Sequence, residues 1–72
     1  MINQKTAQKV GDRLKVNWNK VDLSEFTMGM NEELEHYDVT KGNYLVTGKI
    51  ALAHLRERPD YYTMLRQLKK RR

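Results

Sequence analysis

Apolar residues recur every three or four positions in the first part of the chain. A stretch over about residues 6–15 places three of them on one face of a helix: Ala7, Val10 and Leu14. Gly11 falls inside this stretch and weakens the predicted helix. Residues 16–21 do not keep the period, so we expect a connector there, with the Trp18 indole packed over a small core.

A second apolar pattern follows a helix-start signal. Asp22 precedes Glu25 by three residues, which is the spacing of a capping box with Asp as the cap, and Ser24 is the alternative start. One face of this helix is apolar, and its acidic residues lie largely off that face: Leu23, Phe26, Met30 and Leu34 form the apolar stripe. The turn-forming residues 38–43 predict that the helix ends near Tyr37.

The third helix is predicted from about residue 43 or 44 to residue 57, with an unusually broad apolar face. One edge of that face carries Leu45, Leu52 and Leu55. The other edge carries Val46, Ile50 and Ala53. A face this broad is typical of the central helix of a small bundle, and Gly48, Ala51 and Ala53 are small enough to let neighbouring helices approach.

Pro59 divides the third helix from a fourth. It disfavours helical geometry at Arg58 and can occupy the first position of the next helix, which would place Asp60 in the first turn, near the positive end of the helix dipole. The inward face of this fourth helix is predicted to carry Tyr61, Met64, Leu65 and Leu68. The pattern therefore predicts an all-α fold, a three- or four-helix bundle with a single core, in which residues 1–72 form one domain with a basic C-terminal tail at about 69–72.

Length and composition agree with this picture. A chain of 72 residues has room for one small core, and without cysteine it has neither disulfides nor thiolate metal sites. The first residues lack the apolar core of a signal peptide, and no apolar run reaches the roughly 18 residues of a membrane span. We therefore expect a protein of the bacterial cytoplasm or of a virion, with no membrane contact.

Charge is segregated along the sequence. Residues 21–39 contain six carboxylates and neither Lys nor Arg, whereas the segments on both sides are basic, and the net charge is +5. The acidic helix could attract its basic neighbours within the fold, or the remaining cations could bind a polyanion. The candidates for phosphate contact are Arg66, Lys69, Lys70, Arg71 and Arg72. A second basic face is offered by Lys5, Lys9, Arg13 and Lys15, and the alternative for the tail is a solvated terminus that complements the helix dipole.

Three motifs resemble those of a known family. The chain is similar to small bacterial and phage proteins classed as a domain of unknown function. The similarity lies in ELEH at 33–36, TGKIALAHL at 47–55, Glu57 and PDYYT at 59–63. The similarity covers roughly residues 26–68 and implies a compact helical fold and a bacterial or phage origin, but no activity. The chain departs from the family pattern in a short loop before Thr47 and in its basic ending.

Pairs of His and Glu side chains are the sharpest chemical candidates. Each pair is spaced to share a helix face, and an antiparallel arrangement of two helices could bring together Glu33, His36, His54 and Glu57. Glu-x-x-His motifs bind metals in this way in larger bundles, but this domain offers few carboxylates. The alternative is structural: His54 bonds a backbone carbonyl or Tyr37 at the edge of the core, and His36 caps the acidic helix.

Other site types find less support. Ser24, the only serine, stands where a helix cap is expected, and the glycines have no phosphate-loop spacing. Tyr61 and Tyr62 are adjacent and point about 100° apart on a helix, so one of them is a candidate partner contact. We therefore expect a non-enzymatic accessory protein without a cofactor that binds a protein partner, with self-association left open. The alternatives are an electrostatic nucleic-acid-binding protein that uses its basic termini, and a metal-binding helical protein that uses His36 and His54.

Overall fold

A computed structural model describes residues 1–35 and 41–70, with all their side chains except that of Lys70. Within these ranges the chain forms helices and no strands: α1 (Gln4–Arg13), α2 (Leu23–Leu34), α4 (Tyr44–Glu57) and α5 (Tyr61–Lys70). The predicted all-α bundle is confirmed.

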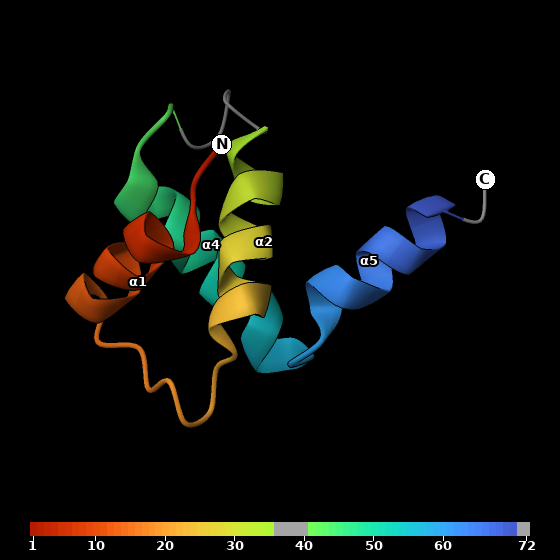
Figure 1. The fold of residues 1–72 in the computed structure, drawn as a ribbon, viewed down its shortest axis with the longest axis horizontal. Helices are drawn as coiled ribbons and strands as arrows, with labels where there is room; N and C mark the ends of the chain where they lie inside the picture. Colours follow the sequence, from red (N-terminus) through yellow and green to blue (C-terminus); the bar gives the residue numbers. More distant parts are fainter. Residues whose placement is uncertain (36–40, 71–72) are drawn as a thin grey trace.

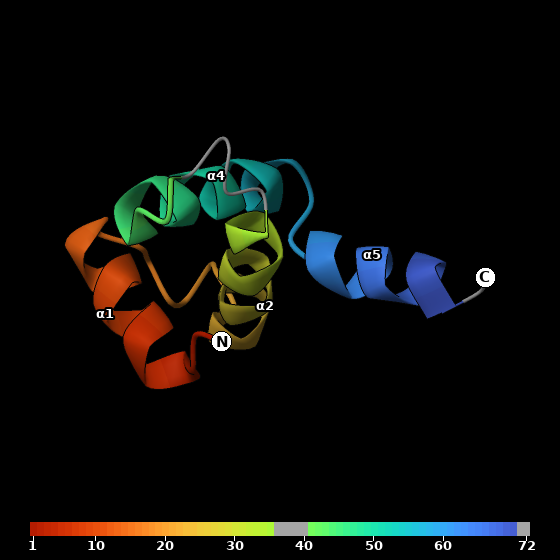
Figure 2. The ribbon, with the colours of Figure 1, turned by 90° about the horizontal axis from the view of Figure 1, so that it is seen from above.

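Three of the helices form a body from which the fourth projects. α2 packs mainly against α4, and α1 contacts both of them. Figure 1 shows α5 leaving this body after the turn that follows α4, and Figure 2, turned by 90°, shows the same separation. Only α2 and α4 contact α5, so the position of α5 depends on what these two helices present to it.

Three side-chain caps set the helix starts. Asn3 accepts a hydrogen bond from the Thr6 amide at 2.8 Å, so α1 begins two residues earlier than its apolar pattern predicted. Asp22 accepts from the amides of residues 24 and 25 at 2.7 and 3.2 Å, which makes Asp22 the cap of α2 and excludes the alternative at Ser24. Asn43 caps α4 in the same way at its second and third residues.

The core draws on every helix and on the segment before α1. Its buried apolar members are Ile2, Ala7, Val10, Phe26, Met30, Ala51, Leu52, Leu55 and Tyr62. Trp18 packs its indole edge-on to Phe26, with ring centroids 5.6 Å apart, and donates its N–H to the Asp12 carboxylate at 2.8 Å. The predicted role of Trp18 over the core is therefore confirmed, and its polar atom is satisfied at the surface.

Two glycines inside helices allow large aromatic side chains to approach the backbone. A Cβ at Gly29 would lie 2.4 Å from the ring of Tyr62, and a Cβ at Gly11 would lie 2.4 Å from the Trp18 indole. Gly11 lowers the helix propensity of α1, as the sequence indicates. The close packing of Trp18 explains why a residue with a side chain does not stand there.

The broad apolar face of α4 is only partly used. The side of the helix that carries Ala51, Leu52 and Leu55 is buried in the core. Leu45 and Val46 are each 37% exposed, because α1 and α2 together cover only one side of α4. Ala53 is exposed as well, so the prediction that both edges of this face are buried is wrong for the first turn of α4 and for Ala53.

The junction at Pro59 ends α4 as predicted but starts α5 differently. Arg58 has an extended backbone (φ −151°, ψ 112°), as expected before proline. α5 begins at Tyr61, so Pro59 and Asp60 lie in the turn before the helix and not in its first turn. The prediction for these two residues is wrong: Asp60 is the residue before the helix, where its carbonyl accepts from the Met64 amide at 3.0 Å and its carboxylate accepts from Arg58 Nε at 2.6 Å.

The inward face of α5 also differs from the prediction. Tyr62 is 2% exposed and is the most buried residue of this helix, whereas Leu68 is 53% exposed. Leu68 is predicted to face inward, but it lies on the side of α5 turned away from the body, whereas the next residue, Lys69, reaches Glu32 of α2. Met64 and Leu65 are half-buried.

Candidate functional site

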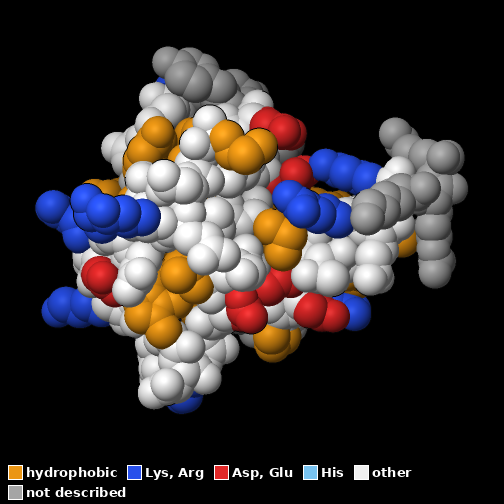
Figure 3. Space-filling view, in the orientation of Figure 1, with side chains coloured by type: hydrophobic (Ala, Val, Ile, Leu, Met, Phe, Trp, Pro, Cys, Tyr) orange, Lys and Arg blue, Asp and Glu red, His pale blue; other side chains and the backbone are white. Residues whose placement is uncertain are grey.

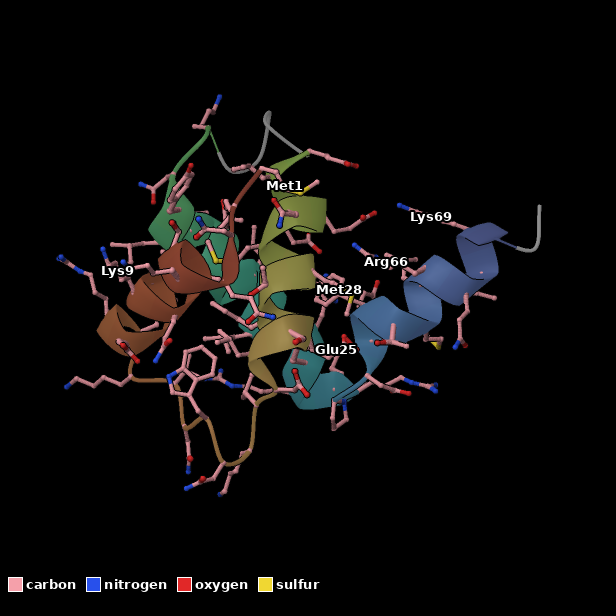
Figure 4. The ribbon with its side chains drawn as sticks, in the orientation of Figure 1. Met1, Lys9, Glu25, Met28, Arg66 and Lys69 are labelled. Atoms are coloured by element: carbon pink, nitrogen blue, oxygen red, sulfur yellow. The ribbon has the colours of Figure 1, made fainter. Side chains whose placement is uncertain are left out.

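A buried carboxylate of α2 binds the first turn of α5. Glu25 is only 6% exposed, and its two oxygens accept from the backbone amide of Thr63 at 3.0 and 3.2 Å. Figure 4 shows Glu25 on the side of α2 where α5 begins. The first amides of a helix lack partners within the helix, so a carboxylate from another helix replaces the missing local cap.

A second carboxylate of α2 binds two aromatic residues. Glu33 accepts from the Tyr62 hydroxyl at 2.8 Å and lies 3.5 Å from His54 Nε2. Burial, with a smaller contribution from the hydrogen bond to Glu33, raises the pKa of Tyr62 well above its usual value. Tyr62 therefore stays neutral and donates a hydrogen bond to Glu33 throughout the ordinary pH range.

The basic side of α5 faces the same acidic helix. Lys69 forms an ion pair with Glu32, and this hydrogen bond raises the pKa of Lys69. Figure 4 shows Arg66 and Lys69 on the side of α5 toward α2. Arg66 is exposed and stays a candidate for phosphate contact, whereas Lys69 is already partnered. The remaining tail candidates, the Lys70 side chain with Arg71 and Arg72, lie outside the described part of the structure.

The two candidate partner-contact tyrosines have different surroundings. The ring of Tyr62 is buried between α2 and α5 and cannot reach a partner in this arrangement. Tyr61 is half-buried and stacks on His54, with ring centroids 4.5 Å apart and planes 10° apart. Tyr61 is thus the accessible member of the pair, since adjacent helical residues point in different directions.

The predicted metal ligands are only partly brought together. Glu33 and His54 lie in contact, but Glu33 already accepts a hydrogen bond from Tyr62. Glu57 lies at the exposed end of α4, and His36 falls outside the described residues. Across residues 1–35 and 41–70, no three acidic, His or Cys side chains converge in a way that could hold a metal ion.

Most cations of the body have no carboxylate partner. The ion pairs of the described residues join His54 to Glu33, Arg58 to Asp60 and Lys69 to Glu32. The exposed cations of α1, the connector and α4 are in none of these pairs: Lys5, Lys9, Arg13, Lys15, Lys20, Lys49 and Arg56. We call this set the basic surface. Figure 3 shows blue side chains gathered over α1, at the far side of the body from α5, and Figure 4 labels Lys9 among them.

A groove opens within the basic surface, between the connector and α4. Its floor is apolar and consists of Leu14, Val16, Val21, Leu52 and Leu55. Its rim and its continuation along α4 carry Lys15, Lys20, Lys49 and Arg56. The groove has a volume of about 310 Å³, and no acidic side chain lines it among the described residues. We call it the basic groove.

The backbone at the rim of the basic groove is unusual. α1 ends in a Schellman turn, in which the Val16 amide donates to the Gly11 carbonyl and the Lys15 amide donates to the Asp12 carbonyl. The position after the cap in this turn normally holds glycine, but here it is Lys15, with φ 61°. A left-handed non-glycine residue costs on the order of 1 kcal/mol, and such strain gathers at functional sites.

Sequence reasoning did not identify this groove. Lys20, Lys49 and Arg56 are separated along the chain, and only the packing of α4 beside the connector brings them to one opening. The sequence contains no signal at Lys15 either, because this residue falls inside the predicted helix over residues 6–15, and only the structure shows it after the helix end. The sequence also did not predict that Glu25 of α2 binds the first turn of α5, since its partner, the Thr63 amide, is 38 residues away.

Comparisons with known proteins give a family. In the described residues, no helix has the length and apolar character needed to cross a bilayer. Neither a curated protein nor a solved structure matches the chain. A family model described as "Protein of unknown function (DUF5661)" matches residues 7–71, a longer stretch than the motifs indicate. The chain therefore belongs to this DUF5661 family of proteins of unknown function.

Proposed function

We propose that this protein is a non-enzymatic interaction module that binds an acidic protein partner through its basic surface. The observation that supports the proposal is that the carboxylates bind groups within the fold, whereas the cations do not. Asp22 caps α2, Asp12 binds the Trp18 indole, and Glu25 binds the backbone of α5, so these carboxylates serve the fold and leave the cations of α1 and α4 unpaired.

The arrangement of hydroxyl groups supports a role without catalysis. Ser24 accepts a hydrogen bond from the Gln4 side chain, and the hydroxyls of Thr27 and Thr47 donate to backbone carbonyls four residues earlier. A catalytic hydroxyl needs a neighbouring base that removes its proton. These three hydroxyl groups instead have structural partners.

Affinity capture with matched charge reversals tests the proposal. The first variant, Lys49→Glu, reverses one cation of the basic surface, and the second variant, Lys41→Glu, makes the same change in charge at an exposed position outside that surface. We expect acidic proteins to be captured by the wild type and by the second variant and to be lost from the first. Equal capture by both variants, or retention of nucleic acid without protein, would contradict the proposal.

A nucleic-acid partner is the second candidate, because one observation favours it. Lys5, Lys9 and Arg13 are exposed on α1 at intervals of four residues, which forms a stripe along one side of the helix. Such a stripe suits phosphate contacts without sequence reading. The measurement is the salt dependence of binding to a generic oligonucleotide, where Lys9→Ala should lower the slope of log K against log salt by about 1.

A further inference from the structure

We infer that the basic groove binds a short linear segment of a partner protein in which one apolar side chain is flanked by Asp or Glu. This inference rests on the proposed function and names the chemistry of the partner at one site. It combines the apolar floor, the cationic rim and the left-handed lysine at the groove edge.

The apolar floor favours a protein segment over a nucleic acid. Single strands are held by aromatic side chains on which their bases stack, and the groove lining contains none. Its floor is aliphatic, from Leu14 and Val16 on one side and Leu52 on the other. An aliphatic or aromatic side chain of a partner would cover this floor and remove it from water.

The rim selects the residues next to that apolar anchor. Lys15 and Lys20 lie on the connector side of the groove, and Arg56 lies on the α4 side. Positive charge is therefore present on both sides of the opening. None of these cations has an ion-pair partner in residues 1–35 and 41–70. Carboxylates on both sides of the anchor would pair with them, which also determines the position of the segment in the groove.

Lys15 links the groove to the backbone. Glycine at this position would relieve the left-handed conformation, since φ is 61° and glycine adopts it freely. A lysine there places a cation on the rim at the expense of folding stability. Lys15→Gly should therefore raise the denaturation midpoint of the free protein and weaken binding of the segment, two effects of opposite direction from one change.

The test uses synthetic peptides and fluorescence anisotropy. Each peptide has one central Leu, Ile, Phe or Trp flanked by Asp and Glu, and each matched control has Ser at the centre with the same charge. We expect at least one apolar peptide to bind about tenfold more tightly than its Ser control. Lys20→Glu and Arg56→Glu should each weaken this binding several-fold, whereas Lys41→Glu, at an exposed position outside both the groove and the basic surface, should have little effect.

The other outcomes separate this inference from the proposed function. Equal binding of apolar and Ser peptides, with loss at high salt, would overturn the groove inference and leave the basic surface as the contact. Binding of an oligonucleotide alone would overturn both. If the wild-type protein, folded by circular dichroism, binds none of the peptides, the groove inference is overturned, and the capture experiment then decides the proposed function by itself.

Discussion

Replacing Glu25 by Ala should detach α5 from the body before the body unfolds. The substitution removes the acceptor of the Thr63 amide, a hydrogen bond to a carboxylate of the kind that contributes about 1.5–3 kcal/mol. Thr63 is exposed, so water can replace part of the lost contact and the lower end of this range applies. We expect the free energy of unfolding to fall by about 1.5 kcal/mol.

Two probes can follow the two parts of the molecule separately. Trp18 contacts Phe26 in the body, away from α5, whereas far-ultraviolet circular dichroism detects all helices. In urea, the dichroism of Glu25→Ala should begin to fall before the Trp18 fluorescence changes, because local opening precedes global unfolding. The Thr63 amide should also exchange its hydrogen faster than in the wild type.

Two further variants make the reasoning refutable. Glu25→Gln keeps an acceptor oxygen without the charge and should cost less than Glu25→Ala. Glu57→Ala removes an exposed glutamate at the end of α4 and should change stability by less than about 0.5 kcal/mol. If Glu25→Ala were neutral or stabilising, the cost of burying this carboxylate would exceed its hydrogen bond, and α5 would need another explanation for its position.

Three further predictions follow from the packing of Tyr62, Gly29 and Asn31. Because the folded-state pKa of Tyr62 lies above its unfolded value of 10.0, the stabilisation from this group is complete below pH 10 and is lost as the pH rises further. A spectrophotometric titration should show one tyrosine that ionises at higher pH than the others, and this step should be absent in Tyr62→Phe. An unchanged titration in that variant would contradict the assignment. Gly29→Ala should lower stability by about 1–3 kcal/mol in thermal denaturation, since its Cβ would lie 2.4 Å from the buried Tyr62 ring. Gly48→Ala should cost less, because its Cβ would meet side-chain ends at longer distances, Leu14 at 2.8 Å and Val10 at 3.0 Å; a reversed order would be evidence against this packing. Asn31→Ala should cost about 2 kcal/mol and increase amide exchange at Ile2, because the Asn31 side chain both accepts from and donates to the Ile2 backbone; protection at Ile2 equal to that of the wild type would show that burial alone holds this segment.

The local features of this fold could be predicted from the sequence. Asp22 has the side chain and spacing of a helix cap, and Pro59 excludes helical geometry at the residue before it. Both act within a few residues of their own position. The helices of the body follow from such signals together with an apolar period of 3.6 residues.

The placement of α5 could not be predicted in the same way. Periodicity identified Tyr61, Met64, Leu65 and Leu68 as one apolar stripe, but the residue that anchors the helix is Tyr62. Its position depends on the space left by Gly29 and on an acceptor, Glu33, both in α2. A pattern within one helix contains no information about which neighbouring helix has such a space.

The candidate site depends on how many carboxylates of α2 pair with cations, which only the structure shows. Sequence analysis left open whether the acidic helix neutralises its basic neighbours, and the contacts decide this for most of α2: Glu25 binds a backbone amide and Glu33 binds a hydroxyl, while Glu32 alone among these three pairs with a lysine. These contacts leave the cations of the basic surface without carboxylate partners among the described residues, and in a chain of net charge +5 these cations repel one another in the free protein. A ligand that brings carboxylates to this surface relieves that repulsion as it binds, so binding and folding stability increase together. The strained backbone of Lys15 is tolerated because other residues stabilise the body. Its helices are capped by Asn3, Asp22 and Asn43.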